Sequence, residues 1–172
     1  MSEIEGLPIV SLQSGEIVAA ARRPIFDMPT LAIIAFLCDL PGSKQPVVLM
    51  TGDIRQVSGD CLIIDSENEL TDPDDVIRLA PHLKANYNPQ GKPVHADTGR
   101  RLGTVDDYTL NLDNCHLQKL YVRSSLLRSW LGSSLAIDRS QIIDVTPNQI
   151  TVRDSTVEAR LLSTETLPES PA

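Results

Sequence analysis

The chain has 172 residues, of which 15 are lysine or arginine and 23 are aspartate or glutamate, so its formal net charge is −8. Non-specific binding to nucleic acid rests on neutralising phosphates, so this charge argues against direct contact with RNA or DNA. The acidic start lacks the basic region of a secretion signal, and the longest apolar run, residues 31–38, is too short to cross a bilayer. We therefore expect a soluble, cytoplasmic protein.

Short runs of branched residues, separated by turn signals, dominate the first half of the sequence. Residues 46–50 and 61–64 have the composition of strands. The segments 27–30 and 58–60 contain the proline, glycine and aspartate residues that favour tight turns. This punctuation is typical of small antiparallel barrels or sandwiches.

Residues 73–83 are predicted to form one short helix. Thr71 or Asp72 can cap its start, and Pro73 suits the first helical position. Asp74 and Asp75 then lie at the positive end of the helix dipole. Residues 86–91, which include a proline and a glycine, are predicted to be a linker.

The remainder of the chain again predicts short strands, at residues 116–122 and 149–152. Turns are expected around Asp113 and at residues 146–148. From residue 161 onward serine, threonine, glutamate and proline prevail, so we expect a disordered acidic tail over 161–172.

The two parts of the chain repeat one another at an offset that drifts between 84 and 88 residues. The matched segments are Gly6-Leu7-Pro8 with Gly91-Lys92-Pro93, Ser14-Gly15 with Thr98-Gly99, Phe26-Asp27 with Leu112-Asp113, residues 31–36 with 117–122, and residues 54–64 with 142–152. Self-similarity of this kind indicates a tandem duplication. We expect one copy in residues 1–86, which includes the helix, and a second in residues 87–160.

Both copies resemble the PRC-barrel family over about residues 5–70 and 90–157. The resemblance is sharpest in Gly91-Lys-Pro-Val94 and in Asp97-Thr-Gly-Arg-Arg-Leu-Gly103-Thr-Val-Asp-Asp107. It implies a mainly β fold of two tandem small antiparallel barrels. Members of the family include the cytoplasmic domain of the reaction-centre H subunit and the C-terminal domain of the ribosome maturation factor RimM. These proteins dock onto larger assemblies and share no active site.

Reactive residues form no pattern that suggests catalysis. His82, His95 and His116 fall in separate elements, and none is spaced to share a metal. Cys115 next to His116 would offer a thiol and a base, but neighbouring residues of a strand point to opposite faces. We expect no catalytic site, metal or cofactor. Cys38, Cys61 and Cys115 are odd in number and widely separated, so we expect reduced, buried thiols.

The two copies differ first in charge. Residues 1–85 contain 6 basic and 13 acidic side chains, whereas residues 86–160 contain 9 and 8. Opposite tendencies of this kind can orient the copies against each other or against a partner, because complementary fields guide association. A solvated surface without a partner is the alternative.

One strand differs more sharply between the copies. In the second copy, alternation predicts that Lys119, Tyr121 and Arg123 point outward. The matched positions of the first copy are Ile33, Ala35 and Leu37, which lie in a strand that is apolar on both faces. Such a strand is usually covered on both faces. The cover is the helix at 73–83, the other barrel or a partner, and homodimerisation through this strand remains open.

Basic and aromatic residues of the second copy form a candidate partner-binding patch. Arginine and tryptophan are enriched at binding hot spots. The candidate residues are Arg100, Arg101, Lys119, Tyr121, Arg123, Arg128 and Trp130. The alternative for Trp130 is that it joins neighbouring leucines in plugging the end of the barrel.

The function that we expect is that of a non-enzymatic adaptor or assembly factor that binds a protein partner in a larger complex. Within the family resemblance, peripheral association with a photosynthetic membrane complex is the leading specific hypothesis. A RimM-like role in ribosome maturation, through a ribosomal protein, is the first alternative. A small-ligand carrier or an enzyme is the second, and it would require a deep pocket with converging polar groups.

Overall fold

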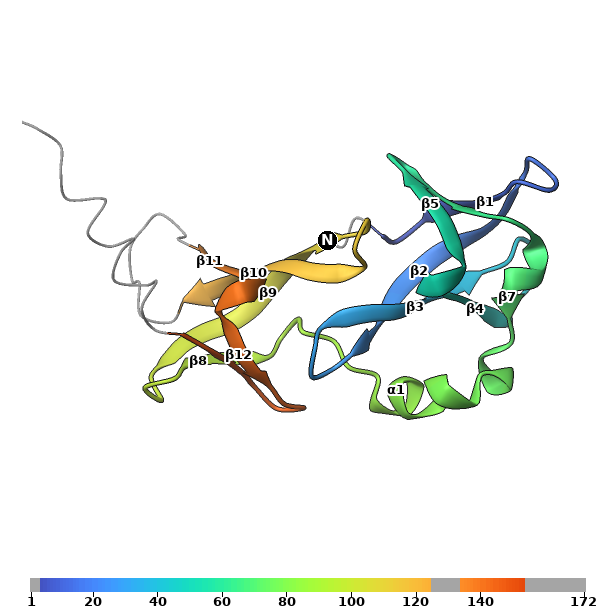
Figure 1. Cartoon of the computed structure of the whole chain (residues 1–172). Coiled ribbons are helices and arrows are strands. Elements are labelled where there is room, and N and C mark those ends of the chain that lie inside the picture. The colour runs from blue at the N-terminus through green and yellow to red at the C-terminus, as the bar shows by residue number, and fades with distance from the viewer. Residues whose placement is uncertain (1–3, 125–133, 154–172) are drawn as a thin grey trace, which may run out of the picture.

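The computed structural model describes residues 4–124 and 134–153, and within them the protein is mainly β (Figure 1). In the first half (residues 4–85) the elements are β1 (Leu7–Ser11), β2 (Ile17–Asp27), β3 (Ala32–Asp39), β4 (Pro46–Met50), η1 (Thr51–Asp53), β5 (Ile54–Ser58), β6 (Cys61–Ile64), η2 (Glu67–Glu69), β7 (Leu70–Thr71), η3 (Pro73–Asp75), η4 (Ile77–Leu79) and α1 (Ala80–Ala85), where η denotes a 3₁₀ turn. In the second half (residues 93–153) they are β8 (Pro93–Ala96), β9 (Arg101–Asn111), β10 (His116–Ser124), β11 (Ser134–Asp138), η5 (Arg139–Gln141), β12 (Ile142–Val145) and β13 (Ile150–Val152).

The second half repeats the strand pairing of the first. Strand β1 pairs antiparallel with β2 and parallel with β6, and β8 pairs in the same two ways with β9 and β13. The resulting orders are β5-β6-β1-β2-β3-β4 and β12-β13-β8-β9-β10-β11. A single contact between β3 and β10 joins them into one mixed sheet. The connected path ends at β5 and β12, so the pairing of the described strands does not close either half into a barrel.

Irregularities of the sheet repeat as well. A β-bulge adds one residue to a strand and changes which face the following side chains occupy. Four bulge positions recur as pairs, namely Val18 and Leu102, Arg22 and Asp106, Ile34 and Gln118, and Arg55 and Ile143. The offset is 84 residues for the first three pairs and 88 for the last.

These bulges correct the sequence match of the third strand by two residues. The turn before β3 ends at Leu31, with φ +55°, and the turn before β10 ends at Cys115, with φ +51°. Leu31 therefore corresponds to Cys115, and not to Leu117 as the sequence match predicted. Because the bulge lies within the mismatched stretch, the error pairs Ile33, which precedes the bulge, with Lys119, which follows it, and these two residues point to opposite sides of the sheet.

The segment expected to be one helix over residues 73–83 is divided into η3, η4 and α1. Asp72 caps the first turn, because its carboxylate accepts a hydrogen bond from the Asp74 N–H at 2.9 Å. Val76 leaves helical geometry at φ −101° and ψ 81°. Pro81 cannot sit inside a helix, so α1 begins beside it and ends at Asn86, which is left-handed at φ 44°.

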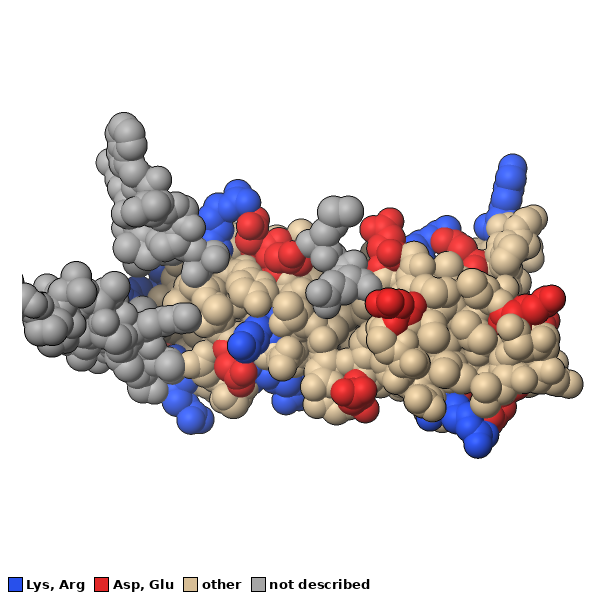
Figure 2. All heavy atoms as spheres, turned by 90° about the horizontal axis from the view of Figure 1, so that it is seen from above, with Lys and Arg blue, Asp and Glu red and all other residues tan. Residues whose placement is uncertain are grey.

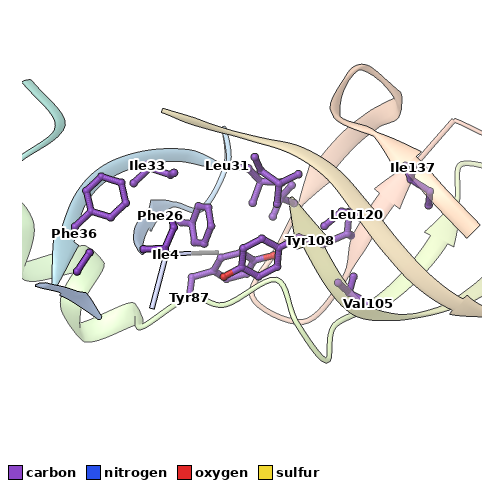
Figure 3. Close-up of a cluster of buried hydrophobic side chains, with 14 of the residues drawn as sticks. Ile4, Phe26, Leu31, Ile33, Phe36, Tyr87, Val105, Tyr108, Leu120 and Ile137 are labelled. Atoms are coloured by element: carbon purple, nitrogen blue, oxygen red, sulfur yellow. The ribbon is translucent and has the colours of Figure 1, made fainter. Parts of the chain in front are cut away.

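Buried apolar side chains form two clusters. The larger one is continuous across both halves, and Figure 3 shows it running from Phe36 in the first half to Ile137 in the second. The smaller cluster lies on the other side of β3, where Ile25, Ala35 and Leu37 pack with Leu79 of η4. Among the described helices, none has the length and apolar character needed to span a membrane.

Candidate interaction surfaces

The outer face of the second half is built on one row of β10. Lys119 and Arg123 are exposed and Tyr121 is half-buried, all on the side of β10 opposite the large core. On one flank, β9 places Thr109, Asp107 and Thr104 beside them; on the other, β11 places Asp138 and Ala136 beside Lys119 and Tyr121. We use "outer face" for these eight residues. None of these eight residues belongs to a buried apolar cluster, whereas Leu79 of η4 and Leu83 of α1 join such a cluster on the equivalent face of the first half.

Charges on the outer face are paired with neighbours of opposite sign. The guanidinium of Arg123 forms an ion pair with the carboxylate of Asp106 on β9. Hydrogen bonds from the Ser140 N–H and hydroxyl, at 3.0 and 2.8 Å, lower the pKa of Asp138, and the ammonium of Lys119 lowers it further. On the side of the whole molecule that Figure 2 shows, basic and acidic side chains are likewise interspersed.

Two further residues of the expected patch lie at the start of β9. Gly99, in the preceding turn, has a φ of +85°, and Arg100 and Arg101 follow it as exposed side chains. The guanidinium of Arg101 donates to the Thr104 hydroxyl at 3.5 Å, and Thr104 pairs with Arg123 across the strands. Arg101 therefore extends the row of β10. Arg128 and Trp130 lie outside the described residues, as does the tail at 161–172.

The equivalent face of the first half is apolar and covered. Ala35 and Leu37 occupy the positions of Lys119 and Tyr121, and Ile25, Met50 and Val48 occupy those of Thr109, Asp138 and Ala136. Leu79 is fully buried against this face, with Val76 and Leu83 beside it. The cover comes from the segment that contains η4 and α1.

Ile33 does not share this face. The bulge at Ile34 interrupts the alternation, so Ile33 points into the large core together with Phe36. Its exposed fraction is 2%, and that of Ala35 is 0%. The two-residue periodicity could not reveal this, because a bulge depends on how the strand pairs and leaves no mark in β3 alone.

A groove lies at the same place in each half, beside the bulge of the third strand. In the first half, a groove of about 410 Å³ is lined by Ile34, Met50, Thr51, Gly52, Asp53, Arg78, Leu79 and His82. In the second, one of about 400 Å³ is lined by Asn111, Asn114, His116, Leu117, Gln118, Asp138 and Arg139. Gln118, Asp138 and Arg139 replace Ile34, Met50 and Thr51. The same backbone thus forms a partly apolar groove in one half and a polar one in the other.

The cysteine and histidine residues are held apart by their backbone contacts. The Cys115 thiol donates to the Leu112 carbonyl at 3.3 Å, whereas Nδ1 of His116 contacts the Asn114 carbonyl at 2.5 Å. Burial raises the pKa of the Cys115 thiol and, at Cys38, raises it to about 12. Groups of three metal-ligating side chains are absent from the described part of the chain.

Comparison of the sequence with known family models finds no match, and comparison with curated proteins finds none either. The structure itself therefore supplies the observations from which a function is inferred.

Proposed function

We propose that this chain is a tandem adaptor of the PRC-barrel type, in which two diverged β units present a docking surface to a protein partner. The repeated strand order and the four repeated bulges support descent of both halves from one β unit. The glycine pattern of residues 91–107 supports the family assignment. In this proposal the protein acts by binding its partner through its surface and catalyses no reaction.

The observation that carries the proposal is the contrast between the two equivalent outer faces. A helical segment fills this position in the first half, whereas the second half presents Lys119, Tyr121 and Arg123 there. Tyrosine and arginine contribute large contact areas and are enriched at hot spots. The nearby carboxylates of Asp106 and Asp107 make the face mixed in charge. We infer a protein partner with its own mixed polar surface, since a polyanion would be repelled by these carboxylates.

A photosynthetic membrane complex is the assembly that the family resemblance favours. The test is capture of the full chain on beads, with detergent-solubilised membranes and ribosomal subunits supplied as separate fractions of a native lysate. The proposal expects enrichment of one membrane complex. Enrichment of a small ribosomal subunit protein instead would replace it with the RimM-like role.

Substitutions on the outer face make this test specific. Lys119→Glu combined with Tyr121→Ala should reduce capture at least ten-fold, because truncation of a hot-spot residue costs about 2 kcal/mol or more. The matched control is Lys44→Glu combined with Leu12→Ala, which changes two exposed residues of the first half. Capture that is unchanged by the first pair, while the circular dichroism spectrum stays that of the wild type, would refute the site.

A further inference from the structure

The contact between the halves has an unusual register. Strand β3 meets β10 through one residue pair, Ala32 with His116. The offset that relates β3 to β10 is 84 residues, so His116 is the counterpart of Ala32 itself. A residue that pairs with its own counterpart lies on a twofold axis, as in the isologous interfaces of symmetric dimers.

The hydrogen bonds on either side of this pair obey the same symmetry. The Ile33 N–H donates to the Cys115 carbonyl at 2.7 Å, and the Leu117 N–H donates to the Leu31 carbonyl at 3.1 Å. Leu117 is the counterpart of Ile33, and Leu31 is the counterpart of Cys115. Each bond is therefore the image of the other across an axis between Ala32 and His116.

Backbone conformation at the contact is also matched. Leu31 and Cys115, which supply the two acceptor carbonyls, are both left-handed, with φ of +55° and +51°. Residues other than glycine adopt this conformation at a cost, and such positions persist where the surroundings require them. In each half the left-handed residue precedes the strand that crosses to the other half.

Apolar side chains from both halves close over this contact. Phe26 and Tyr108 lie close together (Figure 3) and meet edge to face, with ring centroids 5.7 Å apart. Leu31 and Leu117 are each only 1% exposed. Tyr87, in the connection between the halves, lies in the same cluster at 7% exposure. The contact thus has the buried apolar centre of a protein–protein interface.

We propose that the junction is an isologous interface in its own right, in which each half of the chain is the partner of the other half. The connection between the halves is not what holds them. Gln90 and Gly91 already belong to the second half, since the Gly91 N–H donates to the Val105 carbonyl at 2.9 Å and the Gln90 side chain donates to the Asp106 carbonyl at 2.9 Å. Asn86, exposed and left-handed at the end of α1, is the hinge.

The test is to cut this hinge in the folded full-length protein. A protease recognition sequence inserted after Asn86 is cleaved under native conditions, and the products are sized by light scattering at micromolar concentration. The proposal expects one complex with nearly the mass of the intact 18.8 kDa chain. Two separately eluting fragments would overturn it.

Two substitutions in the cut protein then locate the contact. Ala32→Arg places a bulky cation on the axis, opposite His116, and should weaken the association of the halves at least ten-fold. Ile17→Arg, at an exposed position of the first half remote from the junction pair, is the matched control and should leave it unchanged. Equal association of both variants would place the interface elsewhere and refute the axis.

A variant with a shortened connection tests pairing with a second copy. Removal of Asn86 and Asn88, which are both exposed, shortens the connection and leaves the buried Tyr87 in place, so the halves should pair between two chains and the protein should have twice the monomer mass. A folded monomer in which the halves have separated, detected by small-angle scattering, would contradict the proposal. A folded monomer with the wild-type dimensions would contradict the exchange with a second copy.

Discussion

The first half of the molecule covers its outer face with its own helical segment, whereas the residues of the equivalent face in the second half belong to no buried apolar cluster. The backbones are equivalent to the level of individual bulges, yet Leu37 is replaced by Tyr121 and Ala35 by Lys119. These positions are therefore apolar in the half where a helical segment packs over them and polar in the other half, although the strands are equivalent. A repeated fold constrains the pairing of its strands strictly and the chemistry of its surfaces hardly at all.

One ion pair is also kept at equivalent positions of the two halves while the residue types that form it change. In the first half, Arg22 of β2 pairs with Asp39 of β3, with Nη2 2.6 Å from Oδ1 and Nε 2.9 Å from Oδ2. The counterparts are Asp106 of β9 and Arg123 of β10, which also form an ion pair. The halves keep the pair at the bulge and exchange its charges.

Removing the cover of the first half should give the largest effect. Leu79→Ala leaves a cavity between η4 and the outer strands, and buried leucine truncations cost about 2–5 kcal/mol. Denaturant unfolding measures the loss. Ile77→Ala, on the same turn at 86% exposure, should change the free energy of unfolding by less than about 0.5 kcal/mol. Equal effects of the two changes would mean that the packing of η4 against the strands contributes nothing to the free energy of unfolding.

The long second strand of each half offers a second contrast, at Gly103 of β9 and its counterpart Ala19 of β2. A Cβ on Gly103 would lie 2.1 Å from the Arg123 carbonyl oxygen and 2.9 Å from Cγ1 of Val122. Gly103→Ala should therefore destabilise the protein by about 1–3 kcal/mol. Ala19→Gly, the reverse change in the first half, should cost about 0.5–1 kcal/mol through backbone entropy. A Gly103→Ala protein of wild-type stability would show that the backbones of β9 and β10 leave room for a Cβ at residue 103, contrary to this distance.

The exchanged ion pair should give the smallest effect. Asp106→Arg alone places two cations side by side and should cost about 0.2–1 kcal/mol, as expected of an exposed pair. The double change Asp106→Arg with Arg123→Asp reproduces the polarity of the first half and should restore most of that loss. Thermal unfolding at low and high salt measures both. A double variant no more stable than the single one would show that positions 106 and 123 cannot hold an ion pair with the charges exchanged.

Strand positions were largely predictable from the sequence. The runs at 46–50 and 61–64 coincide with β4 and β6, because branched residues bounded by turn signals mark strands in an isolated sequence. The strand expected at 116–122 is confirmed as β10, which extends to Ser124. The repeated pairing left a trace in the sequence because glycines recur at turns that need a positive φ, as at Gly15 and Gly99 with φ of +72° and +85°.

The bulges and the junction were not predictable. Ile33 was expected to share a face with Ala35 and Leu37, but an extra residue in the pairing moves it to the large core. Pro81 contained the signal for dividing the helical segment, since proline belongs in a first turn. The grooves and the axis depend on which strands meet in space, which local composition does not encode.

Cross-linking Ala32 to His116 tests the central claim, that two equivalent halves meet across an axis between these residues. The pair is not hydrogen-bonded directly, and such pairs have Cα atoms about 4.5 Å apart, within the range that a disulfide spans. Ala32→Cys with His116→Cys should form an intramolecular disulfide on mild oxidation, mapped by peptide mass spectrometry, whereas Ser58→Cys with His116→Cys should not. Free thiols at 32 and 116 in the folded, oxidised protein would contradict the account.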